Sequence, residues 1–556
     1  MKNIIKKILK PAAPALLSVC IAAGALAGCA APERSSDSGS NNKSDNSAKK
    51  ERAERDGQHQ KSGAEAGWPK GENGANITDD YYNQEPYNTE EYTAINENSF
   101  MSVSANPLST FAADVDTASY SIVRKKINEG IVPDIDSVRI EEMLNYFTYD
   151  YPQPKEGEPF SVTTEITDCP WNKDSKLMLI GLQAQKVDLS EAKPSNLVFL
   201  IDVSGSMEEP DKLPLVKRAF GLLVEQLKKE DKVSIVTYAS GDEVVLRGAD
   251  GADKNTIKTA IDELAAGGST AGAKGIETAY EIAEKNFIEG GNNRIILATD
   301  GDLNVGITSE GELKKLIKKK KEGGVFLSVL GFGHGNIKDN KLQALADNGN
   351  GNYSYIDSIY EARKVLVSEL GGTCHAVAKD VKLQLEFNPY NVKGYRLIGY
   401  ESRVMAAEDF DDDKKDGGEI GSGHRVTVLY EIVTTDSPME IGGDLKYQDK
   451  TDNTKEAAAD ELATVSIRYK NPDEAASSLL EYPVKKDLIK DQMSDNMSFA
   501  AGVAELGMLL RHSEYAGSSS YDSVLELLGN VRESDDSRDE LKMLVKKLKQ
   551  IDIREN

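Results

Sequence analysis

The stretch NLVFLIDVSGSM, residues 196–207, places oxygen-bearing side chains directly after an apolar run. The apolar run predicts a buried strand over residues 196–202. Asp202, Ser204 and Ser206 then alternate through the following turn, and this spacing of two lets one carboxylate and two hydroxyls converge. Such oxygens suit a small divalent cation, so the sequence predicts a cation site here. The competing interpretation is that these residues only form a turn and cap the next helix.

Two further oxygen-bearing residues lie at similar boundaries of predicted elements. Thr270 lies in the loop AGGSTAG, and Asp300 ends a second apolar strand in NRIILATDGD. With Asp202, Ser204 and Ser206 they resemble the metal-ion-dependent adhesion site (MIDAS) of von Willebrand factor type A (VWA) domains. The resemblance implies a bound Mg²⁺, or Mn²⁺, held by the hydroxyls and by the aspartates directly or through water. It also implies a protein partner whose Asp or Glu completes the coordination.

Strands and helices alternate across residues 195–370, which predicts an α/β domain with a doubly wound, mostly parallel sheet. Strands are predicted at 196–202, 232–239, 242–247, 293–299, 325–331 and 352–356, and helices at 211–229, 254–264, 271–288, 309–322, 339–346 and 358–370. Ligands of such sheets bind beyond the carboxyl ends of the strands. Asp202 and Asp300 both fall at such ends, in agreement with the motif.

Alternating apolar and polar residues flank this domain on both sides. Residues 158–194 contain FSVTTEITD and KLMLIGLQAQKV, and residues 374–470 contain AKDVKLQLEFN, YRLIGYES, HRVTVLYEIV and ELATVSIRYK. Such segments are typical of half-buried strands. We therefore expect a β-sandwich-like domain into which the α/β domain is inserted.

Helical periodicity marks the regions 96–157 and 471–556. DTASYSIVRKKINEG has Asp116 or Thr117 as a candidate N-cap and Gly130 as a stop. The segment from NPLSTFAADVDTASY to RIEEMLNYFTYDYP resembles the N-terminal VWA-associated region of a family of bacterial VWA lipoproteins. The stretch after Cys374, beginning HAVAKDVKLQLEFNP, resembles the C-terminal region of unknown function in that family.

The first 28 residues have the pattern of a secretory signal, with lysines before a mostly apolar core. Leu26-Ala27-Gly28-Cys29 resembles a bacterial lipobox, which implies that Cys29 carries lipid and anchors the protein to the membrane on its extracytoplasmic side. A single transmembrane anchor is the alternative. Residues 29–95 are polar and poor in aliphatic side chains, which predicts a disordered tether.

Net charge excludes some classes of ligand, and the compartment bears on the cysteines. The net charge of −25 argues against electrostatic binding to nucleic acid or anionic lipid. An exported compartment permits a disulfide between Cys169 and Cys374, although their spacing leaves open whether they pair.

Known catalytic motifs are missing from the sequence. It has five histidines, no HExxH motif and no G-x-S-x-G elbow, and GGSTAGAK departs from a phosphate-binding loop. We therefore expect a non-enzymatic, membrane-anchored module that binds a protein through a metal ion. The alternatives are a structural scaffold of the cell envelope and, less favoured, a hydrolase of wall polymers.

Overall fold

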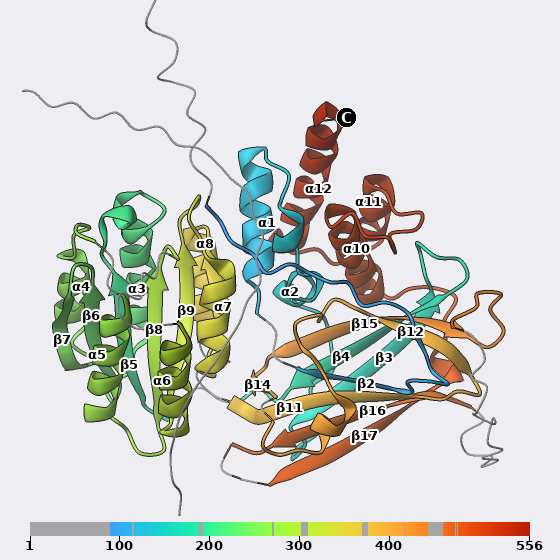
Figure 1. Ribbon diagram of the computed structural model, residues 1–556, viewed down its shortest axis with the longest axis horizontal. Coiled ribbons are helices and arrows are strands. Elements are labelled where there is room, and N and C mark those ends of the chain that lie inside the picture. Colours follow the sequence, from blue (N-terminus) through green and yellow to red (C-terminus); the bar gives the residue numbers. More distant parts are fainter. Residues whose placement is uncertain are drawn as a thin grey trace, which may run out of the picture. The chain divides into compact units, whose positions relative to one another are not determined.

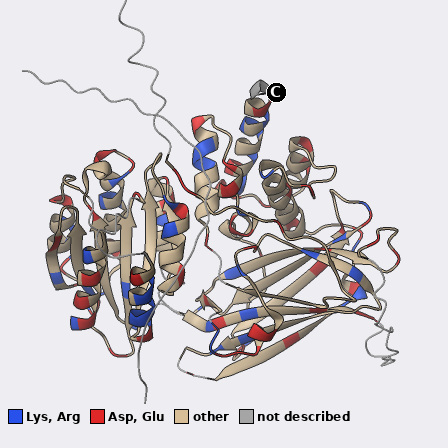
Figure 2. Cartoon of the chain, in the orientation of Figure 1, with Lys and Arg blue, Asp and Glu red and all other residues tan. Residues whose placement is uncertain are grey.

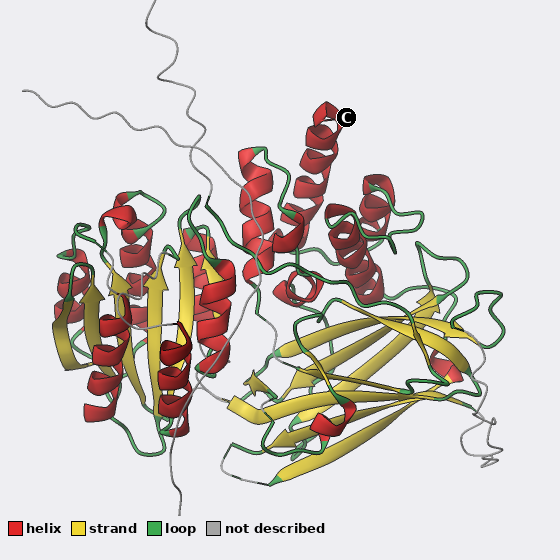
Figure 3. Ribbon diagram, viewed as in Figure 1, coloured by secondary structure: helices red, strands yellow, loops and turns green. Residues whose placement is uncertain are grey.

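The computed structural model describes residues 89–113, 116–187, 193–269, 272–301, 310–369, 376–415, 417–442, 460–472, 474 and 476–555. The predicted signal segment, Cys29, most of the predicted tether, Thr270 and Cys374 lie outside these residues. The described chain contains an α/β unit, a β-sandwich and a set of helices (Figures 1 and 3). No helix within these ranges is both long and apolar enough to cross a bilayer.

The α/β unit is a six-stranded sheet covered by helices on both faces. Its strands, in spatial order, are β10 (Tyr353–Ile356), β9 (Val325–Phe332), β8 (Asn292–Thr299), β5 (Ser195–Asp202), β6 (Lys232–Tyr238) and β7 (Asp242–Asp250). All neighbours are parallel except β7, which runs antiparallel at the edge. This is the predicted doubly wound sheet.

Two apolar layers pack on this sheet, one on each face. The helices are α3 (Leu213–Gln226), α4 (Lys254–Asp262), α5 (Gly272–Lys285), α6 (Glu310–Glu322), α7 (Asp339–Asn348) and α8 (Ile359–Arg363), which continues as a π-helical turn over Lys364–Ser368. The buried apolar residues of α3, α4 and α8 pack on one face of the sheet, and those of α5, α6 and α7 pack on the other. Acidic and basic residues are interspersed on the helices of this unit (Figure 2).

The sandwich consists of two antiparallel sheets. One contains β1 (Met101–Ser102), β12 (Val392–Ile398), β15 (Arg425–Thr434), β4 (Lys176–Ala184) and β3 (Phe160–Asp168); the other contains β13 (Val404–Met405), β2 (Leu108–Ala112), β11 (Ala376–Phe387), β16 (Glu461–Lys470) and β17 (Ser477–Lys485), with β14 (Gly418–Gly421) beside β11. The α/β unit is inserted between β4 and β11, as predicted. The predicted boundaries shift, because β1 and β2 come from the region 96–157 and β17 from the region 471–556.

Helices from both ends of the sequence share one core. They are α1 (Ala118–Glu129), α2 (Ile140–Tyr146), α10 (Asp495–Leu510), α11 (Tyr521–Gly529) and α12 (Asp536–Glu555). Phe147, which follows α2, meets Phe499 of α10 edge to face with ring centroids 4.9 Å apart. The two helical regions predicted separately therefore form a single helical layer.

One predicted cap has another role. Thr117 is the N-cap residue of α1 but makes no side-chain capping bond, whereas Gly130 ends the helix as predicted, with φ of 81°. Asp116 is buried and accepts hydrogen bonds from the Tyr353 N–H at 2.8 Å and from Arg403 at 3.1 Å. Its carboxylate therefore joins the α/β unit to the sandwich instead of capping α1.

A buried ion network joins α1 to the end of the α/β unit. Arg124 binds both carboxylate oxygens of Asp357, at 2.6 and 2.7 Å, and Glu361 of α8 at 2.8 Å. Tyr146 donates to the same Glu361 carboxylate at 2.7 Å. The Arg124, Asp357 and Glu361 side chains are each at least nine-tenths buried. Since each charge depends on the others for compensation, this network fixes α8 against the helical layer.

The possible disulfide between Cys169 and Cys374 stays a prediction, because Cys374 lies outside the described residues. Cys169 is buried directly after β3, where Asp168 pairs with Lys176.

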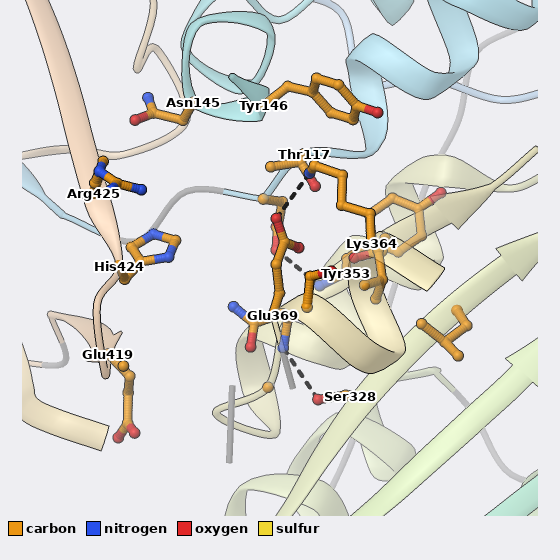
Figure 4. A pocket seen from close by; sticks show the side chains of 18 of the residues that line it. Thr117, Asn145, Tyr146, Ser328, Tyr353, Lys364, Glu369, Glu419, His424 and Arg425 are labelled. Atoms are coloured by element: carbon orange, nitrogen blue, oxygen red, sulfur yellow. Dashed lines mark hydrogen bonds and ion pairs between the residues drawn. The ribbon is translucent and has the colours of Figure 1, made fainter. Parts of the chain in front are cut away.

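A cavity of about 920 Å³ is lined by residues of all three parts. Tyr146 comes from α2, Lys364 and Ser328 from the α/β unit, and His424 and Arg425 from the sandwich (Figure 4). Burial lowers the pKa of His424 to about 4, and the positive charges of Lys364 and Arg425 act in the same direction. His424 is therefore neutral in the folded protein at pH 7.

We expect Arg124→Met to lower the free energy of unfolding by about 3–5 kcal/mol, because it leaves two buried carboxylates without their cation. Urea unfolding monitored by circular dichroism measures this. Arg532, whose side chain is 88% exposed and pairs with Asp495, provides the control. Arg532→Met should change stability by no more than about 0.5 kcal/mol. Equal losses in both variants would contradict the structural role of the network.

Acidification tests the environment of His424. Between about pH 6.5 and 4 the unfolded chain binds a proton at this histidine that the folded chain does not. Its contribution to stability is therefore fully present above pH 6.5 and is lost as the pH falls toward 4. Urea midpoints measured from pH 7.5 to 4.5 should fall less steeply in His424→Gln than in the wild type. Parallel profiles would show that His424 does not contribute.

Candidate functional site

The two aspartates of the predicted cation site lie at the carboxyl edge of the central sheet. Asp202 is the last residue of β5, and Asp300 follows the last residue of the neighbouring strand β8. Both aspartates have no exposed surface. Because β5 and β8 are adjacent and parallel, the fold itself brings residues 98 positions apart in the sequence to one place.

Asp202 is held by hydrogen bonds to both of its carboxylate oxygens. Oδ1 accepts from the Ser204 N–H at 2.9 Å, and Oδ2 accepts from Thr299 at 3.0 Å and from Tyr238 at 3.2 Å. Burial raises its pKa to about 6; the bonds from Ser204 lower it, and the charge of Asp300 raises it further. The carboxylate is thus fixed in position beside a second negative charge.

The two motif serines converge as the spacing predicts. The Oγ atoms of Ser204 and Ser206 are 3.1 Å apart. Adjacent ligands of an octahedral Mg²⁺, at metal–oxygen distances of about 2.1 Å, lie about 3 Å from each other. The hydroxyl pair therefore fits neighbouring positions of such a coordination sphere. Among the described residues, no group of three or more His, Cys, Asp or Glu side chains is placed to hold a metal, so a site here depends on these hydroxyls.

The loop that contains Thr270 runs beside the motif. The Gly205 N–H donates to the Gly268 carbonyl at 3.0 Å, and the Gly267 N–H donates to the Val203 carbonyl at 2.8 Å. Thr270 itself lies outside the described residues, so its part in the site stays a prediction.

The helix-capping alternative does not account for the motif. Ser204 precedes the 3₁₀ turn Gly205–Glu208, but its hydroxyl makes no capping bond to that turn. The next helix, α3, has Lys212 as its N-cap residue and no acidic residue in its first turn. The oxygen atoms of the motif are thus not engaged in capping α3.

Two residues that sequence reasoning missed contact Asp300. The Lys212 ammonium lies 3.1 Å from Oδ2 of Asp300, and Asn336 donates to the same oxygen at 2.9 Å. Lys212 also donates to the Ser206 carbonyl at 2.9 Å. Lys212 lies within ten residues of Asp202, but nothing in the spacing indicates that its long side chain turns back into the site. Asn336 comes from a loop after β9 and carries no sequence signal at all.

The loop 333–338 forms one rim of the site and holds residues of the predicted tether. The Thr89 N–H donates to the Gly335 carbonyl at 2.7 Å, and the Glu91 N–H donates to the Ile337 carbonyl at 3.0 Å. Glu90 pairs with Lys126 of α1 at 2.6 Å. Burial by itself would raise the pKa of Glu90, but Lys126 and the Gly335 N–H hold it below its usual value. The last residues of the predicted tether, 89–95, thus belong to the folded part.

The large cavity described above is a separate feature of the protein. None of the described residues of the predicted cation site lines it. Its lining mixes basic residues, among them Arg294, Arg363 and Arg403, with acidic ones, among them Asp116, Asp347 and Glu419. This balance of charge does not indicate one class of ligand.

Comparison with known proteins identifies the parts of the chain. The family model of the von Willebrand factor type A domain matches residues 196–368, a model described as von Willebrand factor matches residues 86–179, and the model "Uncharacterized protein YfbK, C-terminal" matches residues 372–551. These matches agree with the predicted VWA domain and with the predicted family regions on either side of it.

Individual proteins are similar to this chain to different degrees. The uncharacterized protein YfbK of Escherichia coli (strain K12) is 42% identical over 443 residues, which cover 78% of this chain and 76% of YfbK. Among solved structures, the von Willebrand factor type A protein from Catenulispora acidiphila is similar with a TM-score of 0.41 and 17% identity, over 69% of this chain and 89% of that one. The length and identity of the YfbK match, together with the domain matches, show that this chain belongs to the YfbK family of VWA-domain proteins.

Proposed function

We propose that this protein is a membrane-anchored, extracytoplasmic protein-binding module whose VWA domain takes its partner through a divalent cation. The VWA match supports a role in protein interaction. The observation that carries the cation-dependent part is the convergence of Asp202, Ser204, Ser206 and Asp300 at the carboxyl edge of the sheet. Ligands of doubly wound sheets bind at that edge.

The residues present fit an octahedral cation with hard oxygen ligands. Ser204 and Ser206 supply two hydroxyls at the spacing of adjacent ligands, and Asp202 and Asp300 supply charge. Thr270 is the fifth residue of the proposed set. When bound, Mg²⁺ or Mn²⁺ would supply an incompletely neutralised positive charge that favours an anionic oxygen. We propose that this oxygen belongs to an Asp or Glu of the protein partner.

We further propose that the protein is not an enzyme. The described part of the VWA site contains ligand oxygens and an ammonium. None of its described residues form a pair of a nucleophile and a histidine base. The Ser204 hydroxyl lies beside the Ser206 hydroxyl, and the Ser204 backbone N–H donates to Asp202; neither contact involves a histidine. Such an arrangement supports binding and not covalent catalysis.

Cation binding is the first test of this function. Calorimetric titration of Mg²⁺ and Mn²⁺ into the purified full chain should show one-to-one binding, and Asp202→Ala should abolish it because a charged ligand is lost. Asp250→Ala removes an aspartate of the same sheet that pairs with Lys232 at the surface, and this variant should bind Mg²⁺ as the wild type does. Equal binding by the wild type and Asp202→Ala would exclude this site.

The anchor is tested separately. In cells, Cys29→Ser should move the protein from the membrane fraction to the soluble exported fraction, because the variant lacks the thiol that accepts lipid. Immunoblots of fractionated cells, together with metabolic labelling by a fatty-acid analogue, measure this. A transmembrane anchor would be favoured if the variant stayed in the membrane fraction and neither the variant nor the wild type incorporated the fatty-acid analogue.

A further inference from the structure

We propose that Lys212 is a built-in counter-cation of the VWA site, which neutralises Asp300 in the metal-free protein and lowers the affinity of the site for divalent cations. This inference rests on the proposed cation-dependent function. It concerns a residue outside the five-residue motif, and it assigns a charge to the site that the motif does not contain.

The contacts of Lys212 are those of a bound cation. Its Nζ atom lies 2.9 Å from the Ser206 carbonyl oxygen, 3.1 Å from Oδ2 of Asp300 and 3.4 Å from Oδ1 of Asn336. The Lys212 side chain is 8% exposed and that of Asp300 is fully buried. Three oxygens from three separate segments thus surround one ammonium, and one of them belongs to a proposed metal ligand.

The aliphatic part of Lys212 is enclosed by the loop after β9. Gly333 has φ of 78°, and a Cβ at this position would lie 2.4 Å from Cε of Lys212. Only a glycine leaves room for the lysine here. The lysine therefore has little freedom to leave Asp300 while this loop stays in place.

The same loop is fixed from outside by the N-terminal part of the chain. Its Gly335 carbonyl and N–H bond with Thr89 and Glu90, and Tyr355, which contacts Lys125 of α1, donates to the Gly333 carbonyl. Lys125 and His334 both pair with Asp211, the residue before Lys212, at 3.2 and 3.0 Å. The position of the ammonium is thus set by elements far from the motif in sequence.

The charge of Lys212 has two consequences. In the metal-free protein it places a positive charge 3.1 Å from a carboxylate that is buried near Asp202, and removing a counter-charge from a buried carboxylate is costly. Toward a divalent cation it is a like charge at close range, so it opposes loading of the site. It also leaves the loaded site more positive, which favours an anionic partner over a neutral one.

A purely structural lysine would behave in the opposite way. If Lys212 served only to hold the Ser206 turn and the loop at 333–338, its removal would loosen the ligands and weaken cation binding. The sign of the change in cation affinity therefore separates the two roles.

The experiment is calorimetric titration of Mg²⁺ into the purified full chain, as wild type, Lys212→Met and Lys212→Gln. Loss of the like charge should tighten Mg²⁺ binding on the order of tenfold in both variants. Lys212→Gln keeps a donor for the Ser206 carbonyl, so this variant provides the measurement if Lys212→Met does not fold. Lys217→Met is the matched control: Lys217 lies in the same helix, donates only to the Asp262 carbonyl at the surface, and its loss should leave Mg²⁺ affinity unchanged.

A second measurement requires no metal. In EDTA, Lys212→Met should lower the urea midpoint because Asp300 loses its counter-cation, and Asp300→Asn in the same chain should restore most of that loss. No recovery in the double variant would show that Lys212 acts through packing and would overturn the assigned role. Unchanged or weaker Mg²⁺ binding in Lys212→Met and Lys212→Gln, with binding in the wild type, would overturn it as well. Absence of Mg²⁺ binding in the wild type would instead reject the proposed function itself, and the inference with it.

Discussion

The burial of two carboxylates side by side at the end of a parallel sheet is the constraint on which this site depends. Asp202 and Asp300 have no exposed surface, so solvent cannot compensate the charge of either carboxylate. Asp202 is compensated by three hydrogen-bond donors, whereas Asp300 is compensated by an ammonium and an amide. The surrounding strands and loops supply these donors, which explains why residues from separate segments meet at this edge.

Buried charge also joins the three parts of the protein. Arg124 binds carboxylates at the end of the VWA domain, and Arg139, just before α2, binds Asp339 at the start of α7 at 2.7 Å. Pairs of this kind contribute little net stability compared with apolar packing, but losing one partner is costly, so they select one arrangement of the parts. The helix α8, the last helix of the VWA domain, is consequently held against the helical layer.

The sequence predicted the VWA elements well because their signals are local. Apolar strands ended by Asp202 and Asp300, and amphipathic helices between them, need no information from the rest of the chain. Prediction failed where distant segments complete a layer. The sequence places Leu108–Ala112 in a helical region, because the partner strand β11 follows more than 260 residues later. It also makes Asp116 a cap candidate beside Thr117, whereas in the structure Asp116 binds Tyr353 and Arg403.

By itself, the sequence determined the fold class and the insertion of the α/β unit into a sandwich, because both follow from the order and periodicity of apolar residues. It predicted the motif residues through their resemblance to the VWA family. Only the tertiary structure decided which side chains compensate the buried carboxylates of the motif. Lys212 reaches Asp300 through the length and direction of its side chain, and Asn336 reaches it through a loop held by Thr89 and Glu90. These contacts depend on the positions of segments far apart in the chain, which no local pattern of residues encodes.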